Sequence, residues 1–121
     1  MRVIVTGSRA WPDRKAVFWA LRDVWQEQGA FHLMHGDCST GADAMAQEWF
    51  ELVGQRDGCT VERFHADWGH RGKAAGPERN RRMIAAGADL VLAFPLPEGS
   101  GTQGTIKLAK LAGIPVRIVT S

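Results

Sequence analysis

Short apolar segments alternate with longer amphipathic segments along the whole chain. The apolar, β-branched segments predict five strands, at residues 2–6, 31–35, 60–64, 89–94 and 116–119. Apolar residues three and four positions apart predict four helices, at residues 12–28, 42–53, 77–87 and 102–112. This alternation predicts an α/β fold with a doubly wound, mainly parallel sheet of five strands and helices on both faces.

The apolar positions also predict which face of each helix is buried. In the first helix the buried stripe is Val17, Leu21, Val24 and Trp25. In the second helix it is Ala42, Met45, Ala46, Trp49 and Val53, and Thr40 followed by Asp43 has the spacing of a capping box. Residues 65–76 are polar and predict a loop roughly twice as long as usual, and such long loops are often functional.

Composition narrows the class of protein. The chain has 121 residues, 45% of them hydrophobic and 23% charged, which fits one globular domain covering residues 1–121. A net charge of +2 does not call for a nucleic-acid or membrane partner. Cys38 and Cys59 lack metal-ligand spacing, and there is no signal-peptide pattern or membrane-spanning apolar run, so we expect a cytoplasmic protein.

Glycine-rich turns follow several of the predicted strands. Residues 91–105 pass from an apolar strand through two prolines and three glycines, the last of them Gly104, into an apolar helical pattern, and two other strand ends are similar. Such a turn lets the backbone approach a ligand closely, and the positive end of the following helix dipole attracts anions. In doubly wound sheets these turns meet at the carboxyl edge of the sheet, where ligands bind.

We therefore predict a pocket for a phosphorylated, nucleotide-sized ligand at that edge, without a required cofactor or metal. Helix starts supply N–H donors, hydroxyl groups supply hydrogen bonds, and the planar fork of arginine suits phosphate. Arg79 and Asn80 lie one helical turn before Met83 and Ile84, which should face the sheet, so they should overhang the pocket. The predicted ligand-binding residues are Gly7, Ser8, Arg9, His35, Gly36, Gly41, Ala42, Asp43, Gly76, Pro77, Arg79, Asn80, Gly99, Ser100, Gly101, Thr102 and Thr105.

Each assignment has a structural alternative. Asp43 can be only a capping acid, Arg9 a surface arginine, and Arg79 an ion-pair partner of Glu78 or Asp43. A solvated basic face can account for Arg71, Lys73, Arg79, Arg81 and Arg82. Two less favoured sites are a metal site of His65, Asp67 and His70, and a nucleophilic Cys38 paired with His35.

The motifs at residues 5–9, 35–37, 40–43, 75–80 and 93–102, taken together, resemble the SLOG superfamily, and most closely its YspA-related branch. The resemblance extends in order over nearly the whole chain. It implies a Rossmann-like sheet and a nucleotide or NAD-derived ligand, and an association with phage or defence genes. It also implies a homodimer, because many members of the superfamily pair, and Trp11, Trp19 and Trp49 are candidates for such a surface, with core packing favoured for Trp49.

The superfamily also contains the Lonely Guy phosphoribohydrolases, whose glycine-rich loop is followed by a catalytic glutamate. Residues 99–102 resemble part of that loop and Arg79 matches the arginine of those enzymes, but Thr105 stands at the position of the glutamate. We therefore favour a binding module that acts as a sensor, carrier or sequestering protein. An N-glycosidase with Arg79 and either Asp43 or Glu98 as catalytic residues is the alternative. Single-strand nucleic-acid binding over residues 71–82, with Trp68 as a stacking platform, is the third hypothesis.

Overall fold

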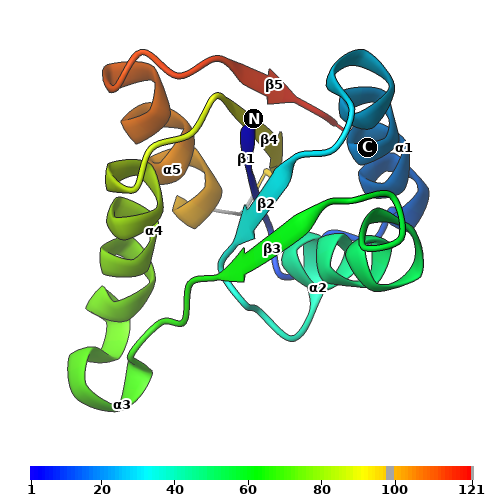
Figure 1. The fold of residues 1–121 in the computed structure, drawn as a ribbon. Coiled ribbons are helices and arrows are strands. Elements are labelled where there is room, and N and C mark those ends of the chain that lie inside the picture. Colours follow the sequence, from blue (N-terminus) through cyan, green and yellow to red (C-terminus); the bar gives the residue numbers. More distant parts are fainter. Residues whose placement is uncertain (98–99, 121) are drawn as a thin grey trace.

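Five parallel strands form one sheet with the order β3-β2-β1-β4-β5, and helices cover both faces (Figure 1). The computed structural model describes residues 1–97 and 100–120. The strands are β1 (Arg2–Gly7), β2 (His32–His35), β3 (Thr60–Arg63), β4 (Leu90–Phe94) and β5 (Val116–Ile118). The predicted Rossmann-like, doubly wound α/β fold is therefore confirmed, and the sheet is wholly parallel.

Two pairs of helices enclose the sheet, one on each face (Figure 1). The first face carries α1 (Arg14–Gln28) and α2 (Gly41–Trp49), which continues into the π-helical turn η1 (Phe50–Gly54). The second face carries α4 (Ala75–Ala85) and α5 (Ser100–Leu111). Successive residues of a strand point to opposite faces of the sheet, and each face has its own hydrophobic core. Val3 and Val5 therefore pack toward the first pair of helices, and Ile4 packs toward the second.

The segment between β3 and α4 is not the long loop that its polar sequence predicts. It contains a short helix, α3 (Trp68–Arg71), and the 3₁₀ turn η2 (Gly72–Ala74), and α4 then begins at Ala75 rather than at Pro77. Asp67 caps α3 by accepting the backbone N–H of His70 at 3.3 Å. The prediction was wrong because local capping builds this helix without a periodic apolar stripe, which is the signal that hydrophobic patterning detects.

The buried helix faces largely agree with the predicted stripes. Val17, Leu21 and Val24 are fully buried, and Trp49 is confirmed as a core residue. Val53 was wrongly predicted to be buried and is 38% exposed, because the π-helical turn changes the angle at which its side chain leaves the helix. Trp11 packs edge-on against Phe94 in the core, with their ring centroids 5.4 Å apart.

The turn after β1 is fixed between α2 and the end of β4. The Ser8 carbonyl accepts the backbone N–H groups of Trp11 at 3.2 Å and Ala42 at 3.3 Å. The Ser8 N–H donates to the Phe94 carbonyl at 3.1 Å, which ties the same turn to β4. Three segments that are distant in sequence therefore meet at the carboxyl edge of the sheet. No described helix combines the length and the apolar character needed to cross a bilayer.

Candidate functional site

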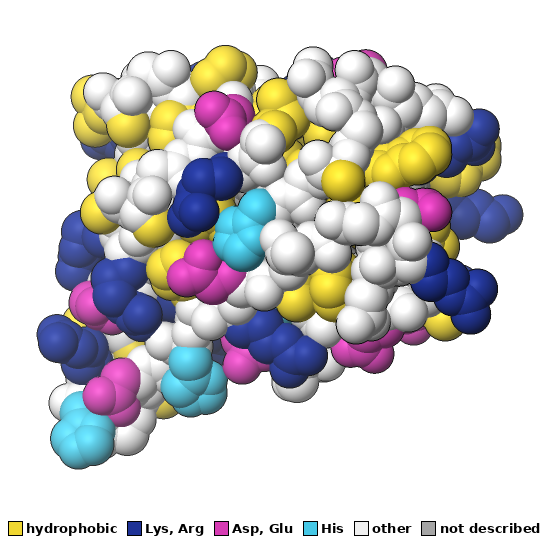
Figure 2. All heavy atoms as spheres, viewed as in Figure 1, with side chains coloured by type: hydrophobic (Ala, Val, Ile, Leu, Met, Phe, Trp, Pro, Cys, Tyr) yellow, Lys and Arg dark blue, Asp and Glu magenta, His cyan; other side chains and the backbone are white. Residues whose placement is uncertain are grey.

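A cavity of about 400 Å³ lies at the carboxyl edge of the sheet. That volume falls within the range of about 300–1,000 Å³ that is typical of small-molecule sites. Polar and charged side chains of both signs gather over the lower left of Figure 2, where α3 and α4 lie. The cavity is lined by Thr6, Gly7, Ser8, Arg9, Cys38, Asp43, Trp68, Lys73, Gly76, Pro77, Arg79, Asn80, Met83, Gly101 and Thr102.

Residues from all four predicted segments come together here. Those that line the cavity are Gly7, Ser8, Arg9, Asp43, Gly76, Pro77, Arg79, Asn80, Gly101 and Thr102. Their convergence agrees with the geometry that the strand-end turns predict, while ligand contact stays a prediction. Gly99 and Glu98 lie outside the described residues, and Ser100 is the first residue of α5.

Besides Gly36, four of the predicted ligand-binding residues do not line this cavity. Ala42 and Thr105 are fully buried, and the Thr105 hydroxyl donates to the Gly101 carbonyl at 3.3 Å within α5. Gly41 packs directly against the backbone of the turn after β1. The His35 ring is also buried, so none of the four lines this cavity.

Arg79 is the buried charge of the site. Its side chain is only 7% exposed, its Nη1 donates to the Gly36 carbonyl, and its Nε donates to Asn80 Oδ1 at 2.8 Å. The ion-pair alternative does not hold for the described part of the chain, because Arg79 forms no ion pair there and Glu78 pairs with Arg82 at 2.8 Å. The buried Asp43 carboxyl acts on this guanidinium electrostatically without forming an ion pair with it, so Arg79 keeps N–H donors that can bind an anion.

Gly36 makes room for that guanidinium. A Cβ atom at this position would lie 2.5 Å from Arg79 Nη1, 2.6 Å from Cζ and 2.9 Å from Nε. No real Cβ contact is that short, so any side chain here would displace Arg79. The predicted importance of Gly36 therefore has a steric explanation, and the residue acts through Arg79.

Asp43 is a buried carboxyl on the cavity wall, in the first turn of α2. Burial raises its pKa, against the opposing influence of His35, Cys38 and Arg79. The capping-box prediction was wrong, because the Thr40 side chain makes no capping hydrogen bond. Asp43 thus lines the cavity, and its raised pKa gives it the character of a group that can hold a proton.

Replacing Asp43 with asparagine is expected to raise the free energy of unfolding at neutral pH by about 1 kcal/mol. The folded protein holds the Asp43 proton more tightly than the unfolded chain does, because its folded pKa is raised. The stability contribution of this group is therefore complete at low pH and is lost as pH rises through the folded pKa. Denaturant titrations between about pH 4 and pH 8 should show this decline in the native chain and not in the variant. Parallel curves for the two proteins would contradict the expectation.

The alternative of a Cys38–His35 nucleophile is not supported by the hydrogen bonds. His35 Nδ1 accepts the Asp37 N–H at 3.0 Å, which leaves the proton on Nε2, facing Gln47 Oε1 at 2.8 Å. Both ring nitrogens are thus engaged away from the thiol. Burial also raises the pKa of the Cys38 thiol, which disfavours the reactive thiolate.

The described residues do not assemble the predicted metal site, and only part of the predicted basic face is exposed. His70 bonds Asp67 at 3.0 Å, while His65 faces Asp37 at 3.5 Å, and no group of three potential metal ligands occurs among the described residues. Arg71, Lys73, Arg81 and Arg82 are exposed, as a solvated face requires, but the buried Arg79 does not belong to it.

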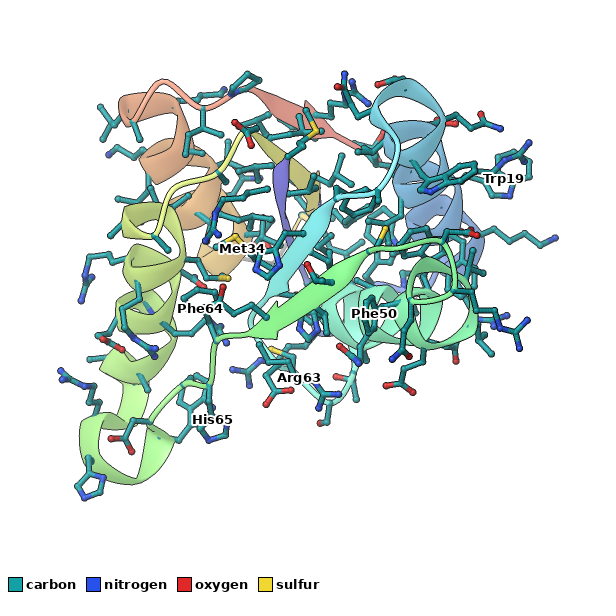
Figure 3. All side chains as sticks on the ribbon, viewed as in Figure 1. Trp19, Met34, Phe50, Arg63, Phe64 and His65 are labelled. Atoms are coloured by element: carbon teal, nitrogen blue, oxygen red, sulfur yellow. The ribbon has the colours of Figure 1, made fainter. Side chains whose placement is uncertain are left out.

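A second, smaller cavity adjoins the first and was missed by sequence reasoning. It measures about 180 Å³ and is lined by Arg9, Gly36, Asp37, Cys38, Ser39, Thr40, His65, Ala66, Trp68 and Arg79. Figure 3 shows His65 just beyond the end of β3, on the edge toward which β2 and β3 point. The Arg9 guanidinium stacks over the Trp68 ring at 4.7 Å. The polar character of residues 65–70 was the available signal, but it does not say where α3 packs.

Comparisons with known proteins identify a family and a phage relative for this chain. A family model described as the YspA, cpYpsA-related SLOG family matches residues 1–70, which is more than half of the chain. The Gene 61 protein of Mycobacterium phage D29 is 43% identical over 117 residues, covering 95% of this chain and 93% of that protein. The second match therefore extends into α4 and α5, which carry Arg79 and Thr102.

Proposed function

This chain belongs to the YspA, cpYpsA-related SLOG family, and from that premise we propose that it binds a nucleotide or NAD-derived phosphorylated ligand in the larger cavity. Membership of the SLOG family implies nucleotide-related ligand binding in general. The observation that carries the proposal is the buried guanidinium of Arg79, which has no carboxylate partner among the described residues. A phosphate group can accept charge-assisted hydrogen bonds from this guanidinium.

The two sides of the cavity suit the two parts of a nucleotide. Guanidinium carries five N–H groups, and two hydrogen bonds engage Nη1 and Nε of Arg79, so donors remain for a phosphate. Asn80 Oδ1 accepts from Arg79, which leaves the Asn80 amide N–H groups to donate as well. Met83 and Pro77 add an apolar wall that can pack against a base.

Calorimetric titration with AMP, NAD, ADP-ribose and cyclic ADP-ribose tests the proposal. We expect saturable binding of at least one of these ligands, and weaker binding of inorganic phosphate, which lacks the base that the apolar wall accommodates. The protein would then act as a sensor, carrier or sequestering module. Absence of binding by all four nucleotides at millimolar concentration would contradict the proposal.

N-glycosidic cleavage is the second candidate function, and Asp43 is the observation that favours it. Thr105 is buried away from the cavity, so the position of the Lonely Guy glutamate offers no acid there. Asp43 lines the cavity with a raised pKa and could donate a proton to a leaving base. Free base released from AMP or ADP-ribose, and lost in Arg79→Met and in Asp43→Asn, would establish this activity. Intact ligand after prolonged incubation would exclude it for those substrates.

Nucleic-acid binding, a homodimer and a cytoplasmic location remain predictions. Single-strand nucleic-acid binding has less support, because Arg79 is buried and Trp68 is stacked under Arg9. Salt-dependent binding of an oligonucleotide would support the nucleic-acid hypothesis.

The homodimer is tested by the solution mass from light scattering. The exposed Trp19 is its best-placed aromatic residue, at 64% exposure. The cytoplasmic location is tested by fractionating the cells that make the protein.

A further inference from the structure

The two cavities share a wall that carries positive charge. Four residues line both of them, namely Arg9, Cys38, Trp68 and Arg79. Arg9 and Trp68 are exposed and contact each other at 4.7 Å, while Arg79 is buried and Cys38 is half-buried. Both guanidiniums lower the pKa of the Cys38 thiol, although the Asp43 carboxyl beside it has a larger opposing influence. The boundary is therefore a position at which two arginine side chains can face one anionic group.

The two cavities differ in size and in chemistry. The larger, of about 400 Å³, has the apolar wall described above. The smaller, of about 180 Å³, has a carboxylate, two hydroxyl groups and an imidazole, from Asp37, Ser39, Thr40 and His65. A volume below about 300 Å³ is small for a complete nucleoside. The smaller cavity is thus better matched to a single sugar ring.

Asp37 is the acidic residue among those that line the smaller cavity. Its carboxylate lines the cavity and is an acceptor for hydroxyl groups, in the way that an acidic residue binds a ribose in dinucleotide sites. The same carboxylate repels a phosphate, so phosphate groups would stay at the arginine boundary. The residue has a φ of 58°, an uncommon conformation for a residue other than glycine. Arg63 and His65 flank it at 3.9 Å and 3.5 Å.

We propose that the ligand is a nucleoside diphosphate that carries a second sugar. The nucleoside occupies the larger cavity, the diphosphate lies between Arg9 and Arg79, and the terminal sugar enters the smaller cavity beside Asp37. This inference rests on the proposed function, because it requires that the larger cavity binds a nucleotide. It narrows that function to nucleotides with two phosphates and a sugar at the far end.

Affinities for a graded set of ligands test the inference. AMP, ADP, ADP-ribose, ADP-glucose and NAD differ in the parts that reach the boundary and the smaller cavity. We expect ADP-ribose or ADP-glucose to bind at least about tenfold more tightly than AMP, which corresponds to about 1.4 kcal/mol. NAD should bind less tightly than the best of these, because the smaller cavity lacks room for a second base.

The Thr40→Trp variant tests the contribution of the smaller cavity separately from that of the larger one. Thr40 lines only the smaller one, is exposed, and makes no capping bond with its side chain, so the substitution should fill that cavity without unfolding α2. We expect ADP-ribose affinity to fall to that of ADP, while ADP and AMP affinities stay unchanged. Thr40→Ala is the matched control, because it removes the hydroxyl and leaves the cavity open, and it should keep most of the ADP-ribose affinity.

The outcomes distinguish this inference from the function on which it rests. If AMP binds as tightly as ADP-ribose, and Thr40→Trp alters neither, the smaller cavity is not used and the inference fails while the nucleotide site stands. If no nucleotide binds at all, the proposed function fails and the inference falls with it. Equal loss of AMP and ADP-ribose binding in Thr40→Trp, with an unchanged melting temperature, would also overturn the assignment of separate parts to the two cavities.

Discussion

Replacing Arg79 with methionine is expected to weaken ligand binding by about 30-fold or more, because truncating one partner of a buried charge pair usually costs about 2–5 kcal/mol. Methionine keeps a long unbranched side chain in the same space but cannot donate to a phosphate. The variant also leaves the Gly36 carbonyl without its donor, so the melting temperature must be measured beside the calorimetric titration. Native-like affinity in a folded Arg79→Met protein would remove the central support for the proposed site.

Two glycine variants test the role of the Arg79 guanidinium in ligand binding without replacing Arg79 itself. Gly36→Ala places a Cβ 2.5 Å from Arg79 Nη1, so it should displace the charge and weaken binding in the same direction. Gly104→Ala is the matched control, because a Cβ there meets no atom within 4 Å and the residue lies in α5 outside both cavities. Equal affinities for these two variants would show that Arg79 does not need the space that Gly36 provides.

Gly41→Ala is expected to lower the free energy of unfolding by about 3 kcal/mol or more, from a left-handed backbone and a steric overlap together. The residue has a φ of 72°, and a Cβ would lie 2.2 Å from the Ser8 carbonyl oxygen and 2.6 Å from Arg9 Cα. Those backbone atoms cannot move without loosening the turn that joins β1, α2 and β4. Chemical denaturation followed by far-ultraviolet circular dichroism measures the loss.

The Gly113→Ala variant distinguishes the cost of the left-handed backbone from the cost of the steric overlap. Gly113 has nearly the same φ, 75°, but a Cβ there meets nothing within 4 Å. It should therefore lose only the conformational part, about 1–2 kcal/mol. If Gly41→Ala and Gly113→Ala were equally destabilised, contact with Ser8 would not be the reason for glycine at position 41. A folded Gly41→Ala protein should also bind ligand less well, because Ser8 and Arg9 line the larger cavity.

Hydrophobic periodicity was a sound guide to the sheet and to most of its helices. The placement of Arg79 and Asn80 one turn before Met83 also agrees with the structure, since all three line the larger cavity. The same reasoning failed for residues 65–76, where capping by Asp67 rather than an apolar stripe forms α3. It also failed for Val53, where a π-helical turn interrupts the regular spacing.

The amino-acid sequence by itself determined the order and type of the main elements, because burial imposes a period of two on strands and 3.6 on helices. It also identified the turns that gather at one edge, because parallel strands end on the same side of a sheet. Only the tertiary structure decided that Arg79 is buried without a carboxylate partner among the described residues, and that Gly36 makes the space for it. Only the tertiary structure, too, placed Trp68 under Arg9 and divided the site into two cavities. The reason is that such contacts join residues far apart along the chain, and no local spacing encodes the distance between them.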